Sequence, residues 1–102
     1  MAAKVSFKDL VNGEKPVLVD FTAAWCGPCK MMAPVLEDVK KKIGEKATIV
    51  KIDIDHNQQF ATNMGISGVP TFVLFKKGRE EWRNVGMISG QQLLGVLEKY
   101  AH

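Results

Sequence analysis

Two cysteines carry the chemistry that this sequence can perform. Cys26 and Cys29 are the only cysteines among 102 residues, and they stand on either side of Gly27 and Pro28, directly after Trp25. A Cys-x-x-Cys pair in a chain without other cysteines indicates either redox chemistry or half of a metal site. The thiolate is the reactive form of cysteine, and the surroundings of each sulfur determine how readily it forms. The position of the two cysteines in the fold therefore bears on whether the pair is a redox site or part of a metal site.

The position of the pair favours thiol–disulfide exchange. An apolar run at residues 17–21 precedes it, and a helical pattern begins at Cys26. Unpaired N–H groups and the helix dipole stabilise a thiolate at such a helix N-terminus. Cys29 lies one turn further along the same side. Cys26 can therefore attack a foreign disulfide, and Cys29 can resolve the mixed disulfide. Gly27 leaves room for an approaching chain, and Pro28 suits a first helical turn.

A zinc site is the alternative use of the two cysteines. Zinc normally takes four protein ligands, or three and a water molecule. The two histidines, His56 and His102, lie 27 and 73 residues beyond Cys29, which is not a zinc-finger spacing. We therefore predict no metal ion and no other cofactor.

Composition limits the remaining function classes. The length predicts one domain over residues 1–102, with 46% apolar and 25% charged residues and a net charge of +3. The longest basic run, residues 40–42, is interpreted as a helix C-terminus, so no nucleic-acid binding is expected. No apolar run approaches the roughly 20 residues that span a membrane. Residues 1–10 lack the pattern of a signal peptide, so we expect a cytoplasmic protein, where a Cys pair is more often catalytic than structural.

Hydrophobic periodicity and capping signals predict eight elements that position the cysteines. They are a short helix at residues 5–10 with Ser6 as its cap, strand 17–21, helix 26–43, strand 48–54, a short helix from Asn57 to Gly65, strand 71–75, an exposed edge strand 80–85, and a final helix begun by the capping pair Ser89 and Gln92. A strand before residue 5 is expected to be very short or absent. In helix 26–43 the four-residue repeat of Met31, Val35, Val39 and Ile43 predicts the buried face, with Met31 and Met32 as core filling and a kink at Pro34.

This order predicts an α/β fold. The crossover helices make the first two strands parallel and the last two form a hairpin, so a mixed central sheet of four or five strands has helices on both faces. Asp20 stands in the apolar strand, where a carboxylate is costly unless it is paired or protonated. Either it lies at a frayed strand end, or it serves the cysteines at the carboxyl end of the strand, six residues before Cys26. Lys51 is either solvated or reaches Asp20 from a neighbouring strand.

From about Val5 to Tyr100 the chain resembles the thioredoxin family, of the bacterial type. The residues that carry the resemblance are Val19-Asp20-Phe21, Ala24-Trp25-Cys26-Gly27-Pro28-Cys29-Lys30, Pro34, Lys51-Ile52-Asp53-Ile54-Asp55, Gly65-Ile66, Gly68-Val69-Pro70-Thr71, Phe75-Lys76, Gly78 and Gly86. The chain departs from the family in a shorter N-terminal segment and in Thr22, where many bacterial members have an aromatic residue.

The resemblance implies a thioredoxin fold and a disulfide reductase that acts as a general electron donor in redox homeostasis. It implies that Cys26 attacks and Cys29 resolves, that the buried carboxyl of Asp20 assists proton transfer at the resolving thiol, and that Lys51 lies beside it. It also implies that Pro70 is a cis-proline against the dithiol.

By the same resemblance, the surface that receives the substrate is formed by Trp25, Gly27, Pro28, Gly68, Val69 and Pro70. The implied partners are an NADPH-dependent thioredoxin reductase as electron source and oxidised proteins as substrates, with the chain itself a monomer. Two other functions stay open, namely a disulfide oxidant or isomerase, and a binding subunit whose activity does not need the thiols.

Overall fold

The computed structural model describes residues 6–101 as a mixed sheet with helices on both faces. Its four strands are β1 (Val17–Thr22), β2 (Thr48–Asp53), β3 (Thr71–Lys76) and β4 (Arg79–Val85), in the order β2-β1-β3-β4. β1 is parallel to β2 and antiparallel to β3, and β3 and β4 form a hairpin. The predicted mixed sheet is confirmed with four strands in the described residues. The predicted helix residue Val5 and any strand before it lie outside those residues.

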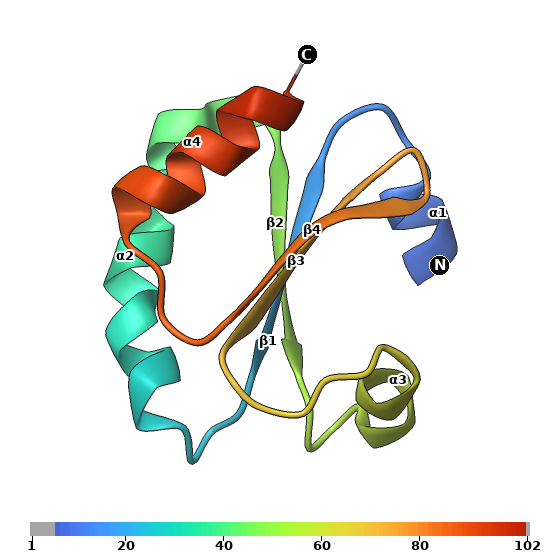
Figure 1. Cartoon of the computed structure of the whole chain (residues 1–102), viewed down its shortest axis with the longest axis vertical. Helices are drawn as coiled ribbons and strands as arrows, with labels where there is room; N and C mark the ends of the chain where they lie inside the picture. The colour runs from blue at the N-terminus through green and yellow to red at the C-terminus, as the bar shows by residue number, and fades with distance from the viewer. Residues whose placement is uncertain (1–5, 102) are drawn as a thin grey trace, which may run out of the picture.

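The helices form two layers, one on each side of the sheet (Figure 1). They are α1 (Phe7–Val11), α2 (Gly27–Ile43), α3 (Gln58–Asn63) and α4 (Gly90–Tyr100), with a short 3₁₀ helix, η1 (Gly44–Lys46), after α2. Leu18 of β1 packs in one core with residues of α2 and α4. Val19 and Phe21, which point to the opposite face, pack in a second core with residues of α1 and α3. The predicted order of helices and strands is confirmed, although the 3₁₀ helix was not anticipated.

The central position of β1 explains its apolar sequence. All five residues from Val17 to Phe21 are buried, because β2 and β3 cover both edges of the strand and helices cover both faces. A strand in such a place has no solvent face, so its sequence does not alternate. Among the described residues β4 pairs with β3 alone, so it is an edge strand, and its charged residues Arg79, Glu80 and Glu81 are exposed, as predicted for an edge.

The predicted buried face of α2 is wrong at Met31 and only partly correct at Val35, which is half-buried. The residues of α2 that are buried are Cys29, Met32, Leu36, Val39 and Ile43. Their alternating spacing of three and four follows 3.6 residues per turn, whereas a strict repeat of four drifts around the helix. Met31 consequently lies on the outer side and is 64% exposed, so only Met32 fills the core.

The predicted caps differ in outcome. Ser6 Oγ accepts the Asp9 N–H at 3.1 Å, and Ser89 Oγ accepts the Gln92 N–H at 3.1 Å, so both serines begin their helices as predicted. Asn57 stands at the N-cap position of α3 without capping it. Its side-chain amide donates instead to the Asp53 carbonyl at 2.9 Å, a local bond that competes with capping.

Candidate active site

The two cysteines lie where β1 passes into α2. Cys26 is the N-cap residue of α2, and its Sγ accepts the backbone N–H of Cys29 at 3.1 Å. The Cys26 N–H in turn donates to the Ala23 carbonyl at 3.1 Å, which fixes the connecting turn. The cysteines form a disulfide with their Cα atoms 5.3 Å apart. The predicted placement of Cys26 at a helix N-terminus is therefore confirmed.

The disulfide is set into an apolar surface. Cys26 is 3% exposed and Cys29 is 9% exposed, and both pack with Ala23, Ile54 and Val69. Because so little of either cysteine reaches solvent, a partner must bring its own disulfide onto this surface to react. The exposed fractions are too similar to show which cysteine attacks a substrate. The positions differ, because Cys26 is the N-cap residue and Cys29 lies within the first turn of α2.

The loop before β3 lies against the cysteines. The Val69–Pro70 peptide bond is cis, as the resemblance implied, and Pro70 is buried. The Pro70 carbonyl accepts the Gly86 N–H at 2.8 Å, and the Gly68 carbonyl accepts the Thr71 hydroxyl at 2.6 Å. These two bonds hold the loop in place on the side where Val69 meets the disulfide.

An exposed rim precedes and begins the helix. The Trp25 side chain is 67% exposed, and its indole N–H donates to Asp55 Oδ2 at 2.8 Å. Gly27 and Pro28 form the exposed first turn of α2. A Cβ atom at Gly27 would meet no heavy atom within 4 Å, so the space beside it is open to another chain.

Asp20 is buried in the sheet beside the helix that carries the cysteines. Asp20 is 4% exposed, and it stands opposite Lys51 in the register of β1 and β2. Burial raises the pKa of the Asp20 carboxyl from 3.8 to about 6, while the positive charge of Lys51 acts in the opposite direction. A carboxyl with this pKa can hold or release a proton near neutral pH. The frayed-end interpretation of Asp20 is thus excluded, because β1 extends to Thr22.

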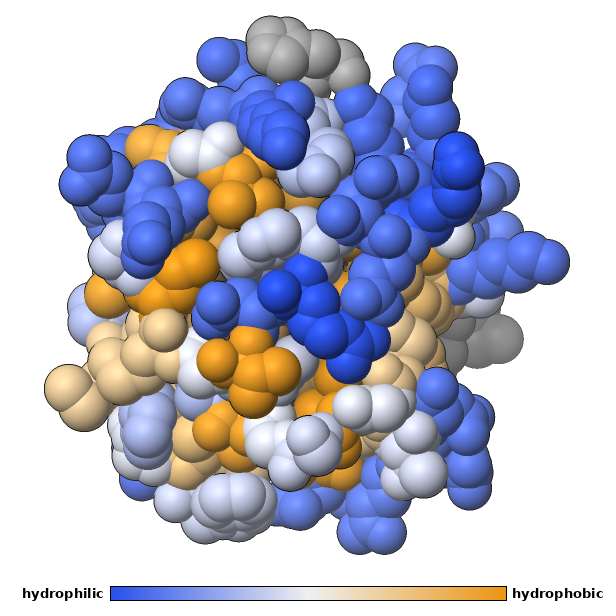
Figure 2. Space-filling model, viewed as in Figure 1, coloured by the Kyte–Doolittle hydropathy of each residue, from blue (hydrophilic) through white to orange (hydrophobic). Residues whose placement is uncertain are grey.

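Sequence reasoning missed Asp55, which contacts the exposed tryptophan, and two exposed apolar residues beside the cis-proline loop. Asp55 orients Trp25, and the Asp53 side chain in turn accepts the Asp55 N–H at 2.8 Å. Val85 and Met87, on either side of the glycine that bonds Pro70, are 63% and 50% exposed. The signal for these two was a pair of apolar residues around Gly86 after a charged strand. In Figure 2 the lower half of the visible face, where Figure 1 places the start of α2, carries more neutral and apolar surface than the upper half.

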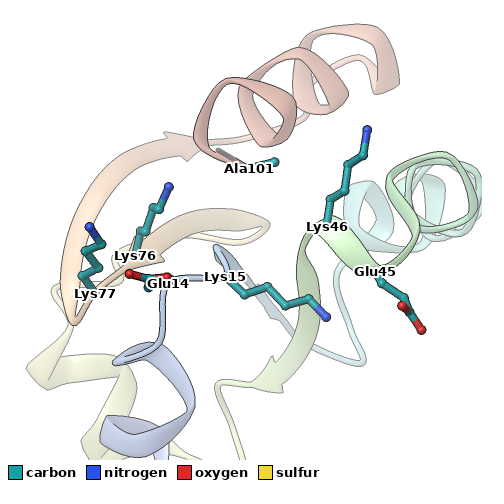
Figure 3. Close-up of a pocket in the computed structure, with 7 residues that line it drawn as sticks. All are labelled: Glu14, Lys15, Glu45, Lys46, Lys76, Lys77 and Ala101. Atoms are coloured by element: carbon teal, nitrogen blue, oxygen red, sulfur yellow. The ribbon is translucent and has the colours of Figure 1, made fainter.

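A hollow lies at the other end of the sheet, away from the cysteines, and neither cysteine lines it. Its volume is about 480 Å³, and Figure 3 shows its wall of charged side chains and Ala101. The residues that line it are Glu14, Lys15, Glu45, Lys46, Lys76, Lys77 and Ala101.

Within residues 6–101, no group of three or more His, Cys, Asp or Glu side chains is placed to hold a metal ion. None of the helices in that range has the length and apolar character needed to cross a membrane.

Comparison with known proteins gives a consistent result. The thioredoxin family model matches residues 1–99. Thioredoxin from Alicyclobacillus acidocaldarius is 46% identical over 88 residues, which cover 86% of this chain and 84% of that protein. Thioredoxin from Mycobacterium bovis is 47% identical over 89 residues, covering 87% and 77%. Among solved structures, a mutant thioredoxin from Halobacterium salinarum superposes with a TM-score of 0.86 at 37% identity, over 98% of this chain and 87% of that one.

A disulfide at the start of a helix, packed against a cis-proline loop on a mixed sheet, defines the class of thiol–disulfide oxidoreductases with a thioredoxin fold. The matches extend over nearly the whole chain and include the cysteines. The chain belongs to the thioredoxin family.

Proposed function

We propose that this chain reduces protein disulfides with Cys26 as the attacking and Cys29 as the resolving cysteine. The observation that supports this order most directly is the bond from the Cys29 N–H to Cys26 Sγ. The same N–H and the helix dipole stabilise a thiolate on Cys26 once the pair is reduced. Cys29 is placed within the first turn behind it, where it can attack the mixed disulfide.

Asp20 is the proposed base for the resolving step. It lies on the face of β1 that is turned to α2, since it alternates with Leu18, which packs against that helix. Its raised pKa suits proton exchange with a thiol near neutral pH. Lys51, opposite it on β2, favours the ionised form and so keeps the base available.

The substrate-binding surface is proposed to consist of Trp25, Gly27, Pro28, Gly68, Val69 and Pro70. The packing of Val69 against the cysteines supports this, because an extended substrate segment beside Val69 could pair with its backbone while presenting a disulfide to Cys26. We propose that the exposed side chains of Val85 and Met87 extend this surface, because the Gly86 N–H between them donates to the Pro70 carbonyl.

Membership of the family supports a proposal for the partners and the location. We propose an NADPH-dependent thioredoxin reductase as the electron source, oxidised proteins as substrates, the cytoplasm as the compartment, and a monomer as the working form. The oxidised pair in the structure is the state that such a reductase would act on.

The test of this proposal is the equilibrium reduction potential of the Cys26–Cys29 pair against a reference thiol couple. A value of about −270 mV, typical of thioredoxin, supports an electron donor to oxidised proteins. A value of about −180 mV or higher, as in protein disulfide isomerase, would contradict the reductase and favour an isomerase or oxidant.

A further inference from the structure

The Asp20 carboxyl has no hydrogen-bond partner among residues 6–101, although the residue is 96% buried. A buried carboxyl without a partner is costly. The carboxyl is not sealed off, however. No enclosed side-chain oxygen in the described residues lacks a partner, so the unpartnered oxygens of Asp20 must touch space that solvent can enter.

That space is a small hollow between α2 and β2. Its volume is about 130 Å³, and Asp20 lines it together with an apolar wall and a charged mouth. Ala33, Leu36 and Ile49 form the wall, and Glu37, Lys40 and Lys51 carry the charges. Since one water molecule occupies about 30 Å³ of liquid, a few water molecules fit beside the carboxyl.

The hollow lies along the same side of α2 as the resolving cysteine. Ala33 lies about one turn beyond Cys29, and Glu37 lies about one turn beyond Ala33, so each neighbours the next on the helix surface. Cys29 is buried, Ala33 is half-buried and Glu37 is exposed. The hollow therefore begins one turn beyond Cys29 and opens to solvent a turn later.

The other sides of Asp20 are closed by apolar residues. Phe72 stands opposite it on β3 and is fully buried, as is Leu18 on the same face of β1. Around the dithiol the neighbours are apolar as well. The charged groups that line the hollow with Asp20 are Glu37 and Lys40 from α2 and Lys51 from β2, and β3 contributes none.

We propose that this hollow is the hydration port of Asp20, and that Ala33 is the positioning residue that keeps it open. The small side chain at position 33 leaves room for water, which solvates the carboxylate and carries its proton to and from solvent. The port thereby sets the pH range in which Cys29 can be activated. This inference rests on the proposed role of Asp20 as the base of the resolving step.

The step that the port serves is balanced without any added reactant. The Cys29 thiol gives its proton to the Asp20 carboxylate, and the Cys29 sulfur then attacks Cys26 Sγ. The Cys26–Cys29 bond forms, and the bond from Cys26 to the substrate sulfur breaks. The substrate leaves as a thiolate, which takes a proton from solvent, while Asp20 returns its proton to solvent through the hollow.

The experiment fills the hollow from either wall and follows the pH profile of substrate release. In Ala33→Leu, and independently in Ile49→Phe, loss of hydration should raise the pH midpoint of the release step by about one pH unit. Release at pH 6.5 then slows about threefold and recovers by pH 9, while the first attack keeps its rate. The carbon-13 resonance of the Asp20 carboxyl in the oxidised protein should titrate with a pH midpoint that is raised by the same amount. Unchanged midpoints in both folded variants would overturn the port.

The charges at the mouth give a matched pair of variants. Glu37→Gln removes a negative charge and should lower the midpoint by about a few tenths of a pH unit, and Lys40→Gln should raise it by a similar amount. Glu98→Gln, an exposed residue on α4, is the control and should leave the midpoint in place. If the midpoint shifted in the same direction in Glu37→Gln and Lys40→Gln, or by no more than in Glu98→Gln, the mouth of the hollow would not lie at Glu37 and Lys40.

Asp20→Asn separates this inference from the proposed function beneath it. If Asp20→Asn releases substrate with the wild-type pH profile, Asp20 is not the base and both ideas fail. If Asp20→Asn removes the midpoint while neither filling variant moves it, the base role stands and the port alone is refuted.

Discussion

The sulfur of Cys29 decides whether a reaction is completed. Cys29→Ser should leave the attack by Cys26 intact and stop the chain at a mixed disulfide, because a hydroxyl cannot displace the bound substrate sulfur. Mass spectrometry after incubation with an oxidised peptide should show a stable adduct on Cys26. Cys26→Ser is the matched control and should give no such adduct. Adducts on Cys26 that resolve at the wild-type rate would contradict the order of attack.

The buried carboxyl also makes stability depend on pH. The pKa of Asp20 is about 6 in the folded chain against 3.8 ordinarily, so the unfolded chain loses this proton first as pH rises. The stabilising effect of the protonated carboxyl is complete below about pH 4, falls through pH 6, and is absent above it. At high pH the buried, ionised carboxylate therefore lowers the free energy of unfolding by about 3 kcal/mol.

Asp20→Asn removes this cost and should therefore make the oxidised protein more stable by up to about 3 kcal/mol at pH 8, with little difference at pH 4. Urea unfolding across this range measures it. The exposed control Glu98→Gln should stay within about 0.5 kcal/mol at every pH. A constant difference between Asp20→Asn and wild type at all pH values would show that the raised pKa is not its origin.

The capping serines are the simplest test among the helices and strands. Ser89 Oγ accepts an otherwise unpaired N–H at the start of α4, so Ser89→Ala should lower the free energy of unfolding by about 1 kcal/mol. Ser89→Gly is the comparison and should cost only a few tenths, since glycine is tolerated at this position. Because Ser89 is not among the residues that pack with the disulfide, the reduction potential should not change. An equal loss in both variants would argue against the hydrogen bond as the cause.

The helices and strands were the most predictable level of this protein. Continuous apolar runs identified β1 and β3, and crossover helices dictated their directions, because these signals depend on burial and connectivity alone. The outward turn of Met31 was not predictable from the spacing of apolar residues, since one exposed apolar residue leaves the pattern almost unchanged. Within the site, the cysteines and Asp20 were evident from their residue types. The bond from Trp25 to Asp55 joins segments 30 residues apart and needed the fold.

At the scale of the whole molecule, one sheet separates two cores. Leu97 of α4 is fully buried on one side, and Val11 of α1 is buried on the other. Leu97→Ala should cost about 2–5 kcal/mol and Val11→Ala about 1–3 kcal/mol. Because the sheet lies between them, the double variant should lose the sum of the two within about 0.5 kcal/mol in chemical denaturation. A large departure from the sum would mean that the cores are coupled through the sheet.

The position of β1 between two partner strands has a consequence for hydrogen isotope exchange. Its amides bond to β2 on one edge and to β3 on the other, so neither edge can fray into solvent. These amides should exchange only when the whole chain opens, which makes their rates a readout of the global free energy of unfolding. The amide of Asp20 lies among them, so the slowest deuterium labels in the protein sit on the strand that carries its proposed base.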